Sequence, residues 1–125
     1  MIYFVTGIGT GIGKTLVSAI LVKALQADYW KPVQTGVEQD AETVKELIAN
    51  HHSLIYPSAY SFQLPASPHA ASKAEGIEID ADKIFLTEFP ENDLIVEGAG
   101  GVLTPLNDAF FMADIPQKIN AEVIL

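Results

Sequence analysis

Short apolar runs alternate along the chain with longer segments that carry helical spacing. Runs at 2–5, 28–33, 93–97 and 122–125 have the length of strands. The run at 93–97 is contiguously apolar between its two acids, which is typical of a parallel strand buried on both faces. Strands separated by helices predict an α/β fold, a doubly wound parallel sheet flanked by helices and joined by right-handed crossovers.

Helical spacing or cap residues mark most of the segments between these runs. The predicted helices cover 15–26, 40–50, 80–89 and 110–119, and a further one starts at Ser67. The first of them carries an apolar repeat at Leu16, Val17, Ile20, Leu21, Ala24 and Leu25. This repeat predicts the face that packs on the sheet.

The polar, proline-bearing segment 51–61 shows no clear periodicity and is interpreted as a loop. It contains His51 and His52, to which the sequence gives no chemical role. His69 comes directly after Ser67 and Pro68, the expected cap and first residue of a helix. We therefore expect His69 to be a first-turn packing or surface residue rather than a catalyst.

The loop between the first strand and the first helix has the composition of an anion-binding loop. Four glycines stand within seven residues, at alternate positions from Gly7 to Gly13. Glycines let the backbone N–H groups turn inward, and the helix N-terminus adds its dipole at the same place. Lys14 can reach the outer phosphates and the Thr15 hydroxyl can ligate magnesium. The segment predicts nucleoside triphosphate binding rather than a plain glycine-rich turn.

The spacing of this loop departs from the standard phosphate-loop pattern. Five residues separate Gly7 from Gly13, where the pattern has four, and Ile8 occupies the position of the first glycine.

Two acids stand where a parallel sheet would place them beside that loop. Glu97 ends the apolar run at 93–97 and precedes the glycine-rich segment 98–101. Ligands of open α/β sheets bind at the carboxyl ends of the strands, so Glu97 has a reason to be charged there, although a solvent-exposed strand end is the alternative. Asp40 opens a predicted helix, so it is either a functional acid or a simple N-cap, and the sequence leaves both readings open.

Composition narrows the function classes. The 125 residues are 49% hydrophobic, which fits one domain with its own core. A formal net charge of −9, with seven lysines and no arginine, argues against nucleic-acid and anionic-membrane partners. The chain has no cysteine, hence no disulfide or thiolate chemistry.

Two expectations concern the ends of the chain and its location. The first strand begins at residue 2, which leaves no room for a signal peptide, and the longest apolar run is far too short to span a bilayer. The expected location is the cytoplasm. The run at 122–125 resembles the opening of a buried strand, so residues 1–125 are interpreted as the N-terminal part of a single P-loop nucleotide-binding domain, whose base-recognition residues the sequence does not identify.

Three blocks, at 7–15, 31–36 and 96–101, together resemble the dethiobiotin synthetases, which catalyse the penultimate step of biotin synthesis. Ser67-Pro68-His69 lies between the last two blocks, as in that family. Many families share a phosphate loop, whereas Lys-Pro-Val with a glycine three residues on, combined with Val-Glu-Gly-Ala-Gly-Gly, is far more specific. The resemblance covers essentially the whole chain but only the N-terminal part of the family's domain.

The resemblance implies a Mg²⁺-dependent reaction in which 7,8-diaminopelargonate, CO₂ and ATP give dethiobiotin, ADP and phosphate through a carbamate and a carbamic-phosphoric anhydride. It implies catalytic roles for Lys31, Lys14 and Thr10, and a substrate contact for Thr35. The implied magnesium ligands are Thr15, Asp40 and Glu97. The implied nucleotide-binding residues are Gly11, Ile12, Gly13, Lys14, Thr15, Leu16, Asp40, Glu97, Gly98, Ala99 and Gly100. A homodimer is implied as well, with the neighbouring chain completing the substrate site.

Two positions in the loop bear on the alternatives. Gly11 stands where members of the family usually carry an acid, which predicts altered activity. Gly9 stands where the partitioning and cell-division ATPases carry a second lysine, which disfavours the alternative of a switch ATPase acting on a protein partner. A third alternative, an amidoligase related to the cobyrinic acid diamide synthases, would need a glutamine-handling cysteine that these residues lack.

Overall fold

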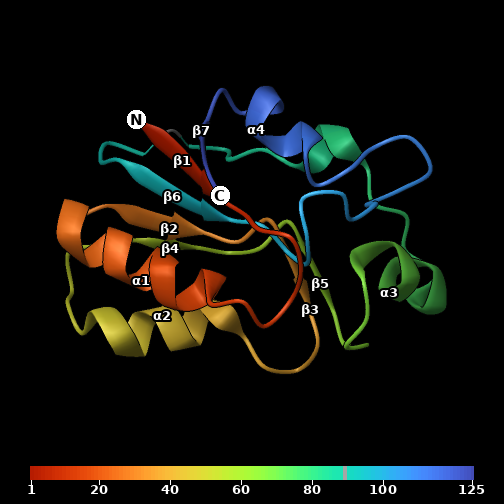
Figure 1. Cartoon of the computed structure of the whole chain (residues 1–125), viewed down its shortest axis with the longest axis horizontal. Coiled ribbons are helices and arrows are strands. Elements are labelled where there is room, and N and C mark those ends of the chain that lie inside the picture. The colour runs from red at the N-terminus through yellow and green to blue at the C-terminus, as the bar shows by residue number, and fades with distance from the viewer. Residues whose placement is uncertain (89) are drawn as a thin grey trace.

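Five parallel strands form the central sheet of the protein (Figure 1), described here from a computed structural model that covers residues 1–88 and 90–125. The strands lie in the order β4-β2-β6-β1-β7. Their bounds are Ile2–Val5 for β1, Asp28–Trp30 for β2, Ile55–Tyr56 for β4, Leu94–Glu97 for β6 and Glu122–Ile124 for β7. All four strand pairings in this sheet are parallel. The predicted parallel α/β fold is confirmed.

The register of this sheet brings three loop-bearing strand ends together. Val5 at the end of β1 pairs with Glu97 at the end of β6, and Trp30 at the end of β2 pairs with Val96. The glycine loop follows β1, and Lys31 follows β2. Because the strands are parallel, these segments leave the sheet at the same edge, which is where open α/β sheets bind ligands.

Helices α1 (Lys14–Leu25) and α2 (Asp40–Ile48) lie together on one face of the sheet (Figure 1). The apolar repeat predicted to pack on the sheet faces largely outward instead, because Leu16, Val17 and Ile20 are 41–57% exposed. The buried side of α1 carries Ser18 and Val22. These residues lie one and two turns after Lys14, whose direction toward the strand ends sets the rotation of the helix.

The opposite face of the sheet is covered mainly by irregular chain and by α4 (Asp114–Lys118) (Figure 1). The helix predicted at 80–89 is wrong over its described residues, since only the 3₁₀ turn η1 (Ala81–Lys83) forms there, capped by Asp80 as expected. Ile84 ends this turn and is buried in the core. Phe89 lies outside the described residues.

The helix predicted at 110–119 is shorter than expected. Phe111 forms an antiparallel bridge with Pro105, and its amide donates to the carboxylate of Asp114 at 2.7 Å. This pairing keeps Phe111 out of the helix, and α4 begins only at Asp114.

A second, two-stranded parallel sheet lies beside the main one. It pairs β3 (Val33–Thr35) with β5 (Tyr60–Phe62), and α3 (Pro68–Glu75) packs against both strands (Figure 1). The single strand predicted at 28–33 is thus divided into β2 and β3, with Pro32 at the break. The loop predicted at 51–61 is wrong as well, because β4 and the start of β5 lie within it. α3 begins at Pro68 after the N-cap Ser67, as predicted.

The remaining strand, β7, pairs with β1 and forms one edge of the described sheet. The strand expected at this end forms in parallel with β1, and within the described residues its Val123 is 54% exposed. The amide of Thr6 donates to the carbonyl of Ile124 at 2.9 Å, which ties the start of the glycine loop to this strand. Within the described part of the chain, none of the helices has the length and apolar character needed to cross a bilayer.

Candidate active site

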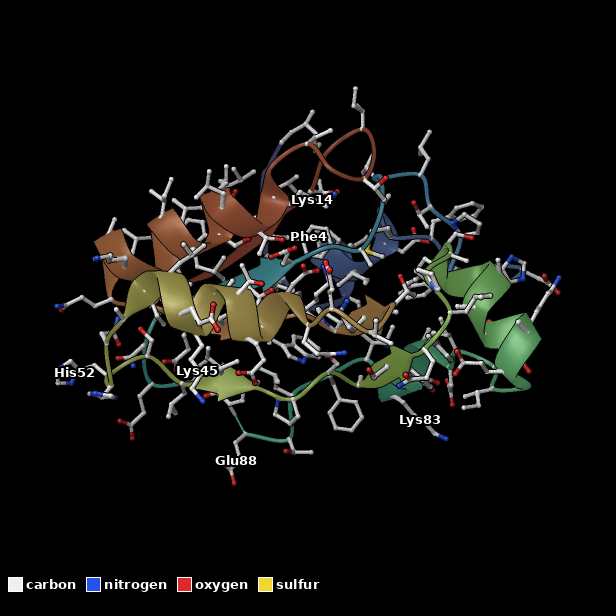
Figure 2. The ribbon with its side chains drawn as sticks, turned by 90° about the horizontal axis from the view of Figure 1, so that it is seen from below. Phe4, Lys14, Lys45, His52, Lys83 and Glu88 are labelled. Atoms are coloured by element: carbon white, nitrogen blue, oxygen red, sulfur yellow. The ribbon has the colours of Figure 1, made fainter. Side chains whose placement is uncertain are left out.

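The glycine loop between β1 and α1 folds around an open space. Gly11 and Gly13 have φ angles of +67° and +100°, a backbone conformation that L side chains rarely adopt. Lys14 is the first residue of α1 (Figure 2), and its Nζ donates to the carbonyl of Gly9 at 2.5 Å, so the amine lies inside the loop. An inward lysine at a helix N-terminus is the arrangement that phosphate-binding loops use.

The segment that follows β6 holds the loop in place. The amide of Gly98 donates to Val5 O at 2.9 Å, and the amide of Val102 donates to Gly7 O at 2.8 Å. At Gly101 a Cβ atom would lie 2.8 Å from the carbonyl oxygen of Ile8, so only glycine permits this approach of the two backbones. The second glycine-rich segment therefore braces the first.

Three charged side chains from separate parts of the chain meet at the mouth of the loop. Lys31 Nζ contacts Glu97 Oε1 at 3.0 Å and is also paired with Asp40 Oδ2. Glu97 is 1% exposed and Lys31 5%, whereas the side chain of Asp40 is 32% exposed. Lys31 therefore lies between two carboxylates in a largely desolvated place, where a charge needs a partner.

Both oxygens of Glu97 have hydrogen-bond donors. Thr15 Oγ1 donates to Oε1 at 2.9 Å, and the buried hydroxyl of Tyr29 donates to Oε2 at 2.9 Å. Burial and the charge of Glu97 raise the pKa of the Tyr29 hydroxyl above its usual range, so it stays protonated and remains a donor. The alternative of a solvent-exposed strand end is thus wrong for Glu97.

Lys14 adds a second positive charge next to this cluster. Burial, followed by the nearby charge of Lys31, lowers the pKa of the Lys14 amine. Both causes disfavour its charged form, whereas an anionic ligand in the loop would favour it.

The helix-cap interpretation of Asp40 is wrong. Helix α2 starts at Asp40, its N-cap is Gln39, and no side chain of that cap bonds the helix start. The carboxylate of Asp40 is directed to Lys31 instead. The side chain of Gln34 accepts a hydrogen bond from the Asp40 amide at 3.2 Å.

Sequence reasoning missed Gln34 and Tyr29. A polar residue within the block 31–36 was the available signal for Gln34. For Tyr29 the chain offered none, because its partner Glu97 lies 68 positions away.

A crevice of about 490 Å³ runs along this cluster, and most of the predicted site residues line it. The predicted residues at its wall are Thr10, Gly11, Gly13, Lys14, Thr15, Leu16, Lys31, Thr35, Asp40, Glu97, Ala99 and Gly100. Two others lie elsewhere: Ile12 covers Gly7 and lines a hollow on the other side of the loop, and Gly98 faces Phe4 and Met112 in the core. The crevice therefore joins residues from all three of the sequence blocks.

A second hollow, of about 760 Å³, opens next to the crevice and shares Thr10, Thr35 and Gly100 with it. Its other walls are largely apolar or small, and include Ile8, Leu103, Pro65, Ala66 and Pro68. The shared residues lie where a ligand in one space would meet a ligand in the other.

The oxygens at the mouth of the loop suit magnesium. Thr15 and Asp40 contribute a hydroxyl and a carboxylate, and Glu97 contributes a second carboxylate. Mg²⁺ is usually held by one or two carboxylates, with phosphate and water oxygens completing its octahedron. The described residues contain no group of three or more His, Cys, Asp or Glu side chains that could hold a metal by themselves. This donor set therefore fits a metal that arrives with a phosphate ligand.

Comparison with known proteins agrees with this geometry. A family model described as AAA domain matches residues 2–125. An ATP-dependent dethiobiotin synthetase of Cytophaga hutchinsonii is 56% identical over 124 residues, which is 98% of this chain and 60% of that protein. The enzyme of the same name from Christiangramia forsetii is 44% identical over 98% of this chain and 60% of its own length.

A longer relative also matches almost the whole of this chain. The biotin biosynthesis bifunctional protein of Bordetella avium is 42% identical over 98% of this chain, which covers 27% of that protein. The chain thus spans about 60% of the length of the two dethiobiotin synthetases. The resemblance drawn from the three sequence blocks is confirmed, and over residues 2–125 the chain belongs to the AAA domain family.

Proposed function

We propose that this chain supplies the phosphate-binding and carboxylating half of an ATP-dependent dethiobiotin synthase. The observation that carries the proposal is the meeting of Lys14, Lys31 and Glu97 at a crevice that opens into a second, apolar-walled hollow. A switch ATPase needs the first space but has no use for a second one of this kind. The names of the similar proteins support the same reaction.

The reaction has three bond-forming steps. One amine of 7,8-diaminopelargonate attacks CO₂ and loses a proton, giving a carbamate. A carbamate oxygen then attacks the γ-phosphorus of ATP, and ADP leaves. The second amine attacks the carbonyl carbon of the resulting anhydride and loses a proton, and phosphate leaves as the ureido ring closes.

The positive charges in the crevice match the places where negative charge develops. The loop amides and the Lys14 amine would hold the phosphates, where preorganised donors stabilise a transferring phosphoryl group. Lys31 follows β2 and would stand between the γ-phosphate and the carbamate. Thr10 and Thr35 line both spaces, so their hydroxyls would orient the carbamate for attack. The hollow beyond them would take the aliphatic part of the diamine.

Magnesium, held by Thr15, Asp40 and Glu97 together with phosphate oxygens, would neutralise charge on the phosphates as they transfer. For this to happen Lys31 must release at least one of the two carboxylates that it contacts. Because Mg²⁺ is a cation like Lys31, Asp40 and Glu97 would still face a compensating positive charge after the exchange.

The assembly and location are part of the proposal. The family resemblance supports a homodimer whose partner completes the substrate site. The cysteine-free, acidic composition supports action in the cytoplasm.

The test is the ligand dependence of ATP turnover by the purified protein. We expect phosphate release to require both 7,8-diaminopelargonate and bicarbonate, with dethiobiotin formed in equal amount, as detected by mass spectrometry. Hydrolysis stimulated only by a macromolecule, with no dependence on the diamine, would favour the switch ATPase instead.

A further inference from the structure

We propose that Gln34 is a positioning residue that sets the place of Asp40 in the active site. The inference rests on the proposed function, because that proposal gives Asp40 a part in binding Mg²⁺ and ATP. Gln34 lies in the middle of β3 and is only 4% exposed. Its side chain lines the crevice, yet neither the phosphate loop nor the charged cluster accounts for it.

The amide group of Gln34 makes three hydrogen bonds to the chain that follows it. Nε2 donates to the carbonyl of Thr35 at 2.9 Å and to the carbonyl of Glu38 at 3.0 Å. Oε1 accepts from the amide of Asp40 at 3.2 Å. One buried side chain thus holds both ends of the turn that joins β3 to α2.

The third of these bonds replaces a missing helix cap. The first N–H groups of a helix have no partner within it and need one from outside. In α2 the N-cap residue Gln39 offers no side-chain bond, and its carbonyl serves the amides of Glu42 and Thr43 instead. The amide of Asp40 is therefore satisfied by Gln34 from a different element.

Only a primary amide of this length can make all three bonds. It presents two donors and an acceptor at one end of the side chain. An ionised glutamate has the same shape but cannot donate to Thr35 and Glu38, methionine has a similar length but neither function, and asparagine is one methylene shorter.

This local network decides where the Asp40 carboxylate points. Asp40 reaches Lys31 from the first turn of α2, and Lys31 in turn contacts Glu97. Removing Gln34 would free the turn and with it the backbone of Asp40. Residues that orient metal ligands typically cost about 10–100-fold in metal affinity when they are replaced.

The first measurement needs neither nucleotide nor metal. Hydrogen exchange is followed by mass spectrometry across 35–41 in the purified protein, comparing Gln34→Met with Val44→Ala. Val44 is buried on α2 one turn after Asp40, so its truncation weakens the helix without removing the amide network. At equal loss of thermal stability, we expect exchange at 35–41 to be about tenfold faster in Gln34→Met. Equal exchange in the two variants would overturn the inference.

The second measurement is the Mg²⁺ concentration that gives half-maximal ATP binding, read by calorimetry. It should rise about tenfold in Gln34→Met and stay unchanged in Val44→Ala. In the Asp40→Asn background the Gln34 substitution should add less than twofold, because its effect passes through Asp40. Additive effects would refute that route.

The two measurements separate failure of the inference from failure of the proposed function. If wild-type protein binds no ATP with Mg²⁺, the proposed function fails while the exchange result still decides the role of Gln34. If Gln34→Met does not fold, Gln34→Asn takes its place in both measurements, since it stays an uncharged amide but is one methylene too short to make all three bonds.

Discussion

Replacing Lys31 by methionine tests the charged cluster most directly. The substitution keeps the aliphatic stem and removes the cation that lies between two carboxylates, one of which is 1% exposed. Breaking a buried ion pair by removing one partner costs about 3–5 kcal/mol, because the other charge stays buried without compensation. Glu97 keeps its bonds from Thr15 and Tyr29, and Asp40 is one-third exposed and can turn to water. We therefore expect the lower end, about 3 kcal/mol.

The assay is thermal and urea unfolding of the metal-free protein in the presence of a chelator. A loss of about 3 kcal/mol corresponds to a fall in Tm of roughly 10–15 °C for a chain of this size. Excess Mg²⁺ should then stabilise Lys31→Met more than wild type, because in the variant the metal does not compete with an ammonium for the two acids.

The matched control is Lys45→Met, which removes the same charge from an exposed position on α2 and should change stability by less than about 0.5 kcal/mol. The reasoning is refuted if Lys31→Met loses no more stability than this control. It is also refuted if Mg²⁺ stabilises Lys31→Met and wild type equally. Either result would mean that the carboxylates do not depend on a cation.

Three further substitutions probe the glycine loop and the hydrogen bonding of Glu97. Lys14→Ala should lower ATP-dependent turnover by at least about 100-fold, since it removes the charge inside the phosphate loop, and near-normal steady-state kinetics would contradict the loop's catalytic role. Gly11→Asp should raise the maximal rate of dethiobiotin formation, because it restores the acid that the family resemblance places at this position, and it should leave ATP affinity equal or weaker; its Cβ would meet no atom within 4 Å, although the φ of +67° strains an L side chain. A rate that is unchanged or lower would show that the reaction does not need an acid at position 11. Tyr29→Phe should cost about 2 kcal/mol in urea unfolding, since it removes a buried donor from the charged Glu97, and a loss below about 0.5 kcal/mol would show that the bond contributes little.

The sequence was most informative where function depends on neighbouring residues. The glycine loop, Lys14 and the strand ending in Glu97 are each readable within a few positions, and the parallel order of strands then places them together. The same reasoning could not find Tyr29, because nothing near it in the chain indicates that its hydroxyl meets an acid from another strand.

The errors in secondary structure have a common physical origin in tertiary contacts. The apolar repeat of α1 predicted the wrong buried face, since a lysine at the helix start had to face the crevice and small residues followed it on the sheet side. β4 was missed because its two residues carry no alternation, and its hydrogen bonds come only from β2. Residues 110 and 111 left the helical pattern because they pair with a segment that precedes them.

The four charges at the crevice have a kinetic consequence for the approach of nucleotide. Lys14, Lys31, Asp40 and Glu97 balance one another, so the site adds little local attraction to offset a chain whose formal net charge is −9. An anion diffusing toward the crevice is thus repelled at long range and attracted only at contact distance, by loop amides and a lysine. Salt screens the first effect far more than the second. For the proposed ATP ligand, ionic strength should therefore hasten the encounter, whereas it slows the approach of an anion to a basic steering surface.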